Sequence, residues 1–236
     1  MRIILHNWTM GKQAAESHLN EDAVKTKTRK RGIKYIAVSD GASESFASRR
    51  WARILVKQFV QNRCVDKVWL AKAIAEYNKD FDRNEMSWSA QAAFDRGSFA
   101  TLLGVKIQGN KASIIVVGDS FVVLDNGSKI LKTLPYTESE QFRENPLLLS
   151  TIQDRNTEVF AKIHKEPKVY LVNKSKLYCM TDALGAWLLA DKSARMEKLR
   201  NLNRKDDFVD MVEQARAEGT MRRDDTTLVI IGHAEG

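Results

Sequence analysis

The segment YIAVSDGASES, residues 35–45, leads a strand-forming sequence directly into an aspartate and a glycine. Asp-Gly is a common way to end a strand, because glycine tolerates positive φ and aspartate can cap its own backbone. Taken alone, the segment therefore predicts an ordinary turn. The same arrangement recurs elsewhere in the chain, and the recurrence needs a further explanation.

Acidic residues stand at one end of five separate apolar runs. They are Asp40 after Tyr35–Val38, Asp119 after Ile114–Val117, Asp182 after Leu177–Met180, Glu21 and Asp22 before Ala23–Val24, and Asp224 and Asp225 before Leu228–Ile231. Carboxylates repel one another, so a group of them in one place needs a counter-ion. That ion could be lysine, arginine or a metal. Oxygen ligands without His or Cys favour Mg²⁺ and Mn²⁺, a pair of which can activate water for attack on phosphorus.

Composition bounds the class of protein. The chain has 236 residues, 43% of them hydrophobic and 29% charged, which predicts a single soluble domain over residues 1–236. No apolar stretch is long enough to span a membrane, and MRIILHNWTMGK (1–12) predicts a first strand rather than a secretion signal, so we expect a cytoplasmic protein. The net charge of +8 is scattered, and no nucleic-acid-binding signature accompanies it.

The two cysteines exclude some chemistries. Cys64 and Cys179 match no metal-binding spacing, and neither precedes the loop and arginine that a phosphocysteine mechanism requires. Because both lie in apolar surroundings, we expect two buried free thiols.

The order of elements predicts the fold class. Strands are expected at 2–8, 22–27, 33–39, 99–108, 111–118, 120–125, 128–133, 168–173, 176–181 and 226–232, and helices within 43–63, 66–83 and 183–217. This order indicates an α+β protein: a four-layer α-β-β-α sandwich with two antiparallel sheets flanked by helices. The stretch 134–168 holds all three prolines and is expected to form an irregular, flap-like segment.

Three local features accompany these elements. Asp66 is a candidate N-cap of the second helix, and Asp206 and Asp207 are candidate caps of a later one. Four tryptophans are expected in or near the core, namely Trp51, Trp69, Trp88 and Trp187.

Six short motifs appear along the chain in a particular order: NED (20–22), VSDGA (38–42), GSFATLL (97–103), VVGDS (116–120), MTDALG (180–185) and DDTTLVII (224–231). In this order the chain resembles the metal-dependent serine/threonine protein phosphatases of type 2C, the PPM family, as a divergent bacterial-type member. The resemblance extends from about residue 17 to residue 231. It implies two antiparallel sheets flanked by helices, in agreement with the order of elements.

The resemblance also implies a site with two Mg²⁺ or Mn²⁺ ions. The implied metal ligands are Asp22, Asp40 as the bridging residue, the Gly41 carbonyl, Asp182, Asp224, and Asp119 for a third, weaker ion. Glu21 would act on the metals or their waters. Asp225 is either a neighbour that supports Asp224 or part of a surface turn.

The sequence departs from the family where the substrate phosphate would bind. The family usually has an arginine where this chain has Ser17, followed by His18. Ser17 and Ser43 are candidate substrate-binding residues. His18 either contacts phosphate or protonates the leaving group, or is a hydrogen-bonded structural residue. The arginines that could replace the missing one are Arg31, Arg49, Arg50, Arg222 and Arg223.

Two further departures lie inside the motifs. Ala183 stands where glycine is usual, and Phe121 stands where arginine is common.

These observations predict a metal-dependent hydrolase of phosphoserine and phosphothreonine in proteins, acting through a metal-activated water. The expected partner is a phosphorylated protein with a cognate serine/threonine kinase, and the expected state is a monomer that binds neither nucleic acid nor membrane. Two alternatives remain open: a catalytically weak or inactive phosphatase-like protein that binds metal and a phosphorylated partner, and a two-metal phosphohydrolase for a small molecule.

Overall fold

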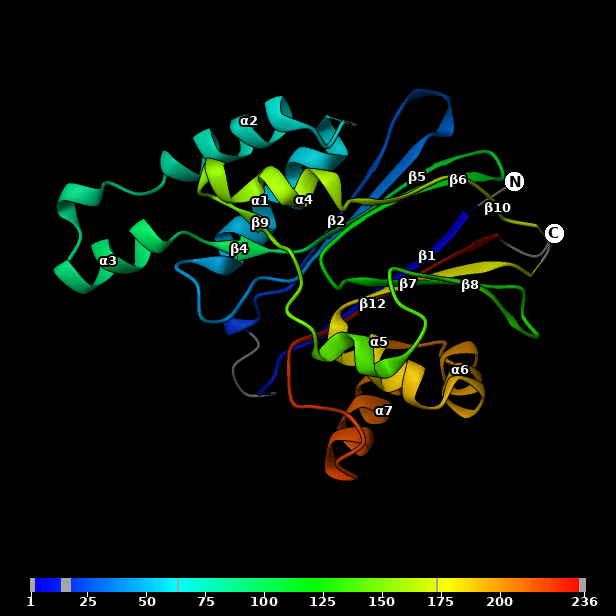
Figure 1. Ribbon diagram of the computed structural model, residues 1–236. Coiled ribbons are helices and arrows are strands. Elements are labelled where there is room, and N and C mark those ends of the chain that lie inside the picture. The colour runs from blue at the N-terminus through cyan, green and yellow to red at the C-terminus, as the bar shows by residue number, and fades with distance from the viewer. Residues whose placement is uncertain (1–2, 14–17, 63, 173, 234–236) are drawn as a thin grey trace. The chain divides into compact units, whose positions relative to one another are not determined.

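The computed structural model describes residues 3–13, 18–62, 64–172 and 174–233, and the chain divides into two compact units (Figure 1). Unit 1 contains residues Met1–Asn20, Asp119–Asn145 and Tyr170–Gly236, and unit 2 contains Glu21–Gly118 and Pro146–Val169. Each unit contains a five-stranded sheet with its own helices. The predicted fold class, α+β with two antiparallel sheets flanked by helices, is confirmed.

The sheet of unit 1 has the strand order β1 (Ile3–Met10), β12 (Thr226–His233), β11 (Lys176–Met180), β7 (Phe121–Asp125) and β8 (Ile130–Leu134). Helices α5 (Asp182–Ala190), α6 (Lys192–Arg200) and α7 (Lys205–Ala217) lie on one face of it (Figure 1). Trp187 and Phe208 from these helices pack in one apolar core with Phe121 and Tyr178 of the sheet. Helices were expected within 183–217, and three form there. Asp191 ends α5 and caps α6 by accepting a hydrogen bond from Ala194 N at 3.2 Å.

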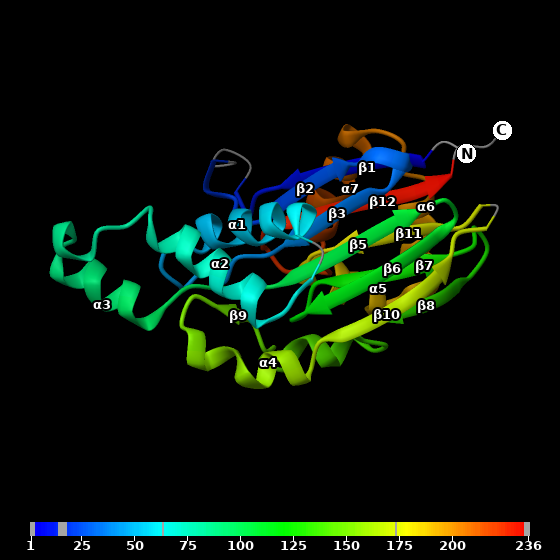
Figure 2. The same ribbon diagram turned by 90° about the horizontal axis from the view of Figure 1, so that it is seen from above.

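The sheet of unit 2 has the strand order β10 (His164–Tyr170), β6 (Lys111–Val117), β5 (Leu102–Gln108), β3 (Lys34–Ser39) and β2 (Ala23–Thr28). Helix α1 (Ser48–Gln61) packs on β2 and β3, and α2 (Lys67–Asn78) packs on α1 (Figure 2). Helix α3 (Trp88–Arg96) lies beyond the end of α2 (Figure 1). It leads into β4 (Phe99–Ala100), which pairs with β9 (Leu149–Ser150).

Short elements occupy the predicted flap-like stretch 134–168. They are the 3₁₀ turns η4 (Ser139–Arg143) and η5 (Gln153–Asn156), strand β9, helix α4 (Thr157–Ala161) and the first residues of β10. Two other 3₁₀ turns are η2 (Lys30–Gly32), at the tip of the β2–β3 hairpin, and η3 (Arg83–Glu85), before α3. Within the described residues, no helix has both the length and the apolar character needed to cross a bilayer.

Two of the three predicted caps, Asp66 and Asp207, are confirmed. Asp66 accepts a hydrogen bond from Trp69 N at 2.8 Å at the start of α2. Asp207 accepts one from Arg204 N at 3.0 Å at the start of α7, and Asp206 lies in the first turn of the same helix.

Two predictions about burial are wrong. Trp51, Trp69 and Trp187 are buried as expected, but Trp88 is 91% exposed because α3 lies at the edge of unit 2 and buries no residue. Cys64 is exposed, since it follows the end of α1 in a connecting segment, whereas Cys179 in β11 is buried.

Candidate active site

Unit 2 brings together the first group of predicted ligands at one end of the β2–β3 ladder. Ala23 pairs with Ser39, so the next residues beyond the ladder, Asp22 and Asp40, lie at the same end of two antiparallel strands. Hydrogen bonds between Asp40 N and Thr101 Oγ1 at 2.8 Å and between Thr101 N and Asp40 O at 2.9 Å hold this loop against β5. These bonds fix the backbone from which the Asp40 side chain projects.

Glu21 and Gly41 complete this group. Glu21 accepts a hydrogen bond from Ser48 Oγ at the start of α1. Gly41 is buried against the same turn, and a Cβ at this position would lie 2.9 Å from the carbonyl carbon and oxygen of Ser48. Only glycine allows the Asp40 loop to approach the first turn of α1 this closely.

Unit 1 brings together the second group at one edge of its sheet. Met180 of β11 pairs with Phe121 of β7 and with Leu228 of β12, so the start of β7, the end of β11 and the start of β12 share an edge. The predicted ligands Asp119, Asp182 and Asp224 flank these three strand ends. The register of the sheet, rather than their distance in sequence, makes them neighbours.

A guanidinium group lies among these three acids. Arg222 forms an ion pair with Asp182, and its Nη2 atom is also 3.4 Å from Asp224 Oδ2. Lys12 Nζ is 4.0 Å from Asp224 Oδ1. Burial raises the pKa of Asp119, and repulsion from Asp224 adds to this effect, while Arg222 opposes it. The chain thus supplies a cation of its own to carboxylates that it partly removes from water.

The donors present fit a hard cation in character. Asp182 Oδ1 is buried and accepts no hydrogen bond from the part of the chain that the structure describes. A metal ion is a partner that can satisfy a buried carboxylate oxygen of this kind. No group of three or more Asp, Glu, His or Cys side chains among the described residues is arranged around a common point for an ion. In unit 1 the guanidinium of Arg222 donates a hydrogen bond to the other carboxylate oxygen of Asp182, Oδ2.

Asp225 has a supporting position rather than a place in an exposed turn. The residue is buried, and its Oδ1 accepts a hydrogen bond from Lys12 N at 2.7 Å. Arg216 donates to the carbonyl oxygens of Gly11, at 2.9 Å, and Asp224, and to Thr226 Oγ1 at 3.0 Å. These bonds hold the turn that carries Asp224 at the start of β12.

The predicted phosphate-binding residues are dispersed. Ser17 lies outside the described residues, and His18 and Ser43 are exposed. Arg50 pairs with Asp80 at 2.5 Å, and Arg31 lies in η2 at the hairpin tip. Arg49 is half-buried in the first turn of α1, and Arg223 is exposed. Among the candidate arginines, Arg222 forms ion pairs with the predicted ligands Asp182 and Asp224.

Both motif departures have a structural reason. Ala183 lies in the first turn of α5, where helical geometry suits alanine better than glycine. Phe121 is fully buried and packs against Phe142 with ring centroids 5.6 Å apart, so it belongs to the core of unit 1.

Two arginines beside the Asp40 loop carry no signal in the sequence. Arg96 at the end of α3 and Arg155 in η5 line a pocket in unit 2 together with Ala42 and Phe99. They are separated by 59 positions, so no local sequence signal could have paired them.

The sequence matches the family model described as protein phosphatase 2C over residues 11–224. No curated protein gives a significant match. Solved structures with a similar fold include the serine/threonine phosphatase Stp1 from Staphylococcus aureus, with a TM-score of 0.67 and 15% identity over 100% of this chain and 96% of that chain.

Two further structures are similar in fold. PppA, a regulatory component of the T6SS in Pseudomonas aeruginosa, has a TM-score of 0.65 and 15% identity over 98% of both chains. The photosystem II phosphatase PBCP has a TM-score of 0.65 and 13% identity over 99% of both chains. At these identities the structural likeness establishes the fold alone, whereas the sequence match extends over most of the chain.

Proposed function

Because the chain belongs to the protein phosphatase 2C family, we propose that it hydrolyses phosphoserine and phosphothreonine in proteins with the help of Mg²⁺ or Mn²⁺. The observation that carries the proposal is the presence of both acidic groups within the matched residues, with a buried, orphaned oxygen on Asp182. A carboxylate oxygen in that state favours a bound cation.

The metal-holding roles follow the two groups. In unit 2, Asp22, Asp40 and the carbonyl of Gly41 would hold the ions, with Asp40 as the bridging ligand and Glu21 acting on the ions or their waters. In unit 1, Asp182 and Asp224 would hold an ion, and Asp119 would serve a third. When bound, such ions lower the pKa of water and neutralise phosphoryl charge. Asp225, Lys12 and Arg216 keep Asp224 in place.

The reaction is a hydrolysis. Water attacks phosphorus, the ester P–O bond breaks, and the serine or threonine oxygen leaves with a proton, which yields inorganic phosphate. His18 is the candidate donor of that proton, with Ser17 and Ser43 as candidate substrate contacts. Arg222 is the candidate phosphate-binding arginine, because a guanidinium matches two phosphate oxygens at once.

A second candidate function is a phosphatase-like protein that binds metal and a phosphorylated partner without turnover. The ion pairs of Arg222 with Asp182 and Asp224 favour it, because they use oxygens that the reaction assigns to a metal. The absence of arginine at position 17 supports it as well.

The proposed function implies a partner, a cellular location and an oligomeric state. The partner would be a phosphoprotein that a cognate serine/threonine kinase modifies, and the protein would act as a cytoplasmic monomer. The scattered positive charge and the lack of a nucleic-acid-binding signature support a protein partner rather than a nucleic acid.

The deciding experiment is Mn²⁺-dependent hydrolysis of p-nitrophenyl phosphate and of a phosphothreonine peptide by the wild type, Asp40→Asn and Asp210→Asn. Asp210 is an exposed residue of α7 and provides a matched loss of charge. Turnover that needs metal, vanishes in Asp40→Asn and persists in Asp210→Asn supports the proposal. Hydrolysis of p-nitrophenyl phosphate without hydrolysis of the peptide would favour the small-molecule alternative.

Absent turnover with Mn²⁺ binding still detectable by calorimetry would favour the second candidate. If the protein shows no turnover and does not bind Mn²⁺, both candidate functions are overturned.

A further inference from the structure

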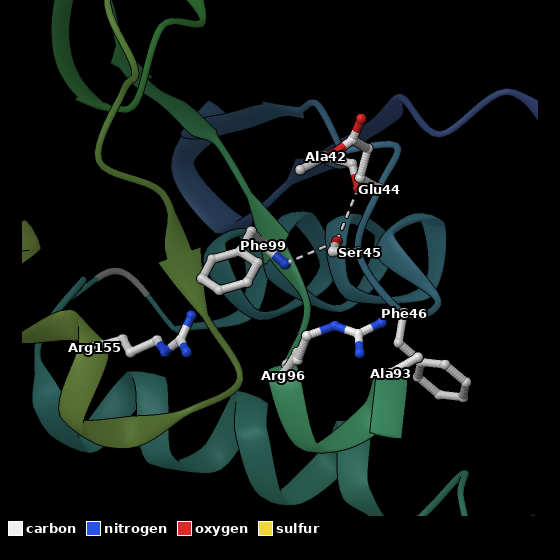
Figure 3. Close-up of a pocket in the computed structure, with 9 residues that line it drawn as sticks. Ala42, Glu44, Ser45, Phe46, Ala93, Arg96, Phe99 and Arg155 are labelled. Carbon is white, nitrogen blue, oxygen red and sulfur yellow. Dashed lines mark hydrogen bonds between the residues drawn. The ribbon is translucent and has the colours of Figure 1, made fainter. Parts of the chain in front are cut away.

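A pocket of about 300 Å³ lies beside the Asp40 loop of unit 2 (Figure 3). The loop that follows β3 supplies Ala42 and Ser45, the end of α3 and the start of β4 supply Arg96 and Phe99, and η5 supplies Arg155. Each of these segments is distant from the others in sequence. The fold therefore assembles two arginines next to a loop that the proposed function assigns to metal binding.

The charge of this pocket is suited to an anion. Arg96 is exposed and forms no ion pair with any residue that the structure describes. The Arg155 guanidinium carbon lies over the ring of Phe99, 5.5 Å from its centroid. The one acid in the lining, Glu44, is exposed and lies on the opposite side of Ser45 from both guanidinium groups (Figure 3).

The backbone that carries the two arginines is fixed. Thr151 N donates to Ser98 O at 3.0 Å, and Ser98 N donates to Thr151 Oγ1 at 2.8 Å, so the segment after Arg96 is bonded to the segment before Arg155. Gly97 has φ of +86°, and a Cβ there would lie 2.6 Å from Ile152 Cγ1. Positive φ and close packing both require glycine at this position.

The turn that carries Arg155 has a second anchor. Asn156 is buried, accepts a hydrogen bond from Ser150 N at 2.8 Å and donates to Ile152 O at 2.8 Å. Arg155 therefore projects from a turn that is closed by hydrogen bonds rather than from a loose loop.

The pocket is directly linked to the Asp40 loop. Ala42 N donates to Phe99 O at 2.9 Å, Ser45 Oγ donates to Ala42 O at 2.8 Å, and Phe99 N donates to Ser45 Oγ at 3.1 Å. Ala42 follows Asp40 by two residues, a span of at most about 7 Å. A group bound in the pocket would therefore lie within a few residues of a phosphate held near Asp40.

Resting on the proposed function, we propose that this pocket binds an acidic side chain of the phosphoprotein substrate, close in sequence to the phosphorylated residue. A carboxylate accepts paired hydrogen bonds from a guanidinium, and the volume suits one side chain better than an extended ligand. Trp88 at the start of α3 is 91% exposed, and an exposed tryptophan on the element that supplies Arg96 favours a protein as the occupant.

The test compares two phosphothreonine peptides that differ only in Glu or Gln at the positions flanking the phosphothreonine. The wild type should show a higher kcat/KM for the Glu peptide, and added salt should reduce the difference. Arg96→Gln and Arg155→Gln should each lower kcat/KM for the Glu peptide about fivefold and leave the Gln peptide and p-nitrophenyl phosphate unchanged. Arg53→Gln, at an exposed position of α1, is the charge-matched control and should change none of them.

A binding measurement separates this inference from the proposed function. Fluorescence anisotropy without metal should show weaker binding of the Glu peptide to Arg96→Gln and Arg155→Gln than to the wild type. If no substrate is hydrolysed but this difference in binding remains, the proposed function fails and the pocket assignment stands. If both arginine variants keep the wild-type preference in turnover and in binding, the pocket assignment is refuted.

Discussion

Arg222→Ala tests the electrostatics of the acidic group in unit 1. In the structure this guanidinium pairs with Asp182 and approaches Asp224 to 3.4 Å, so a cation entering that group must compete with it for carboxylate oxygens. Removing the side chain should have two opposite effects. The protein without metal loses the counter-charge of its acids and becomes less stable, while its affinity for Mn²⁺ rises.

The structure bounds the magnitude. The side chain of Arg222 is 46% exposed and that of Asp224 is 34% exposed, so their contact has the value of a surface pair, while Asp182 at 11% exposure contributes more. Together the contacts stabilise the metal-free protein by roughly 1–2 kcal/mol. That corresponds to a decrease in Tm of about 2–8 °C for a chain of this size. The same free energy corresponds to an increase in Mn²⁺ affinity of roughly 5- to 30-fold.

The assays are thermal unfolding in the presence of a chelator and calorimetric titration with Mn²⁺. Arg223→Ala is the matched control, because it removes the same charge from the adjacent, exposed residue, which pairs with no acid among the described residues. It should change neither measurement by more than a small fraction of the Arg222→Ala effect. Unchanged or weaker Mn²⁺ binding in Arg222→Ala would refute the competition, and an unchanged Tm would show that the ion pairs contribute no stability.

Three further predictions concern the framework. Arg200→Met should lower the free energy of unfolding by about 3–5 kcal/mol in urea, because it leaves the fully buried Asp125, now paired at 2.6 Å, without its counter-ion. Arg204→Met, at an exposed pair, is the control and should cost much less; equal losses would contradict this. A thiol reagent should label Cys64 rapidly in the native protein and Cys179 only after unfolding, since burial raises the pKa of the Cys179 thiol; rapid labelling of both would be the contrary result. Burial raises the pKa of Glu76, but hydrogen bonds from Lys57 and Gln58 at 2.6 Å outweigh it and lower the pKa overall. A carboxyl group with a lowered pKa stabilises the fold at pH values above its unfolded pKa of about 4.3. Glu76→Gln should therefore lower the free energy of unfolding by about 0.5–1 kcal/mol at pH 7, and this difference from the wild type should vanish as the pH falls through the folded pKa. Urea unfolding at pH 7 and pH 3 measures the difference, and an equal difference at both pH values would refute the prediction.

Local signals in the sequence predicted much of the fold, because the physics that produces them is local. The Asp66 cap needs only a free amide three residues later, and it was predicted correctly. Asn126 and Gly127 form the turn between β7 and β8, with Gly127 at φ +90°, and Asn-Gly is a local sequence signal for such a turn. Helix α3 was missed because it carries no apolar stripe and buries no residue, and its N-terminus depends on Ser87, whose Oγ accepts from Ala90 N at 3.4 Å.

Acidic residues at the ends of strands were recognisable in the sequence, because a carboxylate beside an apolar run is a local pattern that does not depend on the tertiary structure. The sequence by itself therefore determined the fold class and the two sets of acids. Tertiary structure alone decided what accompanies them. The pairing of β11 with β12 brings Arg222 to Asp182 across 40 positions, and the two-residue ladder of β4 and β9 brings Arg96 and Arg155 to one pocket. Strand register sets both placements, and it depends on the packing of whole sheets rather than on any short stretch of sequence.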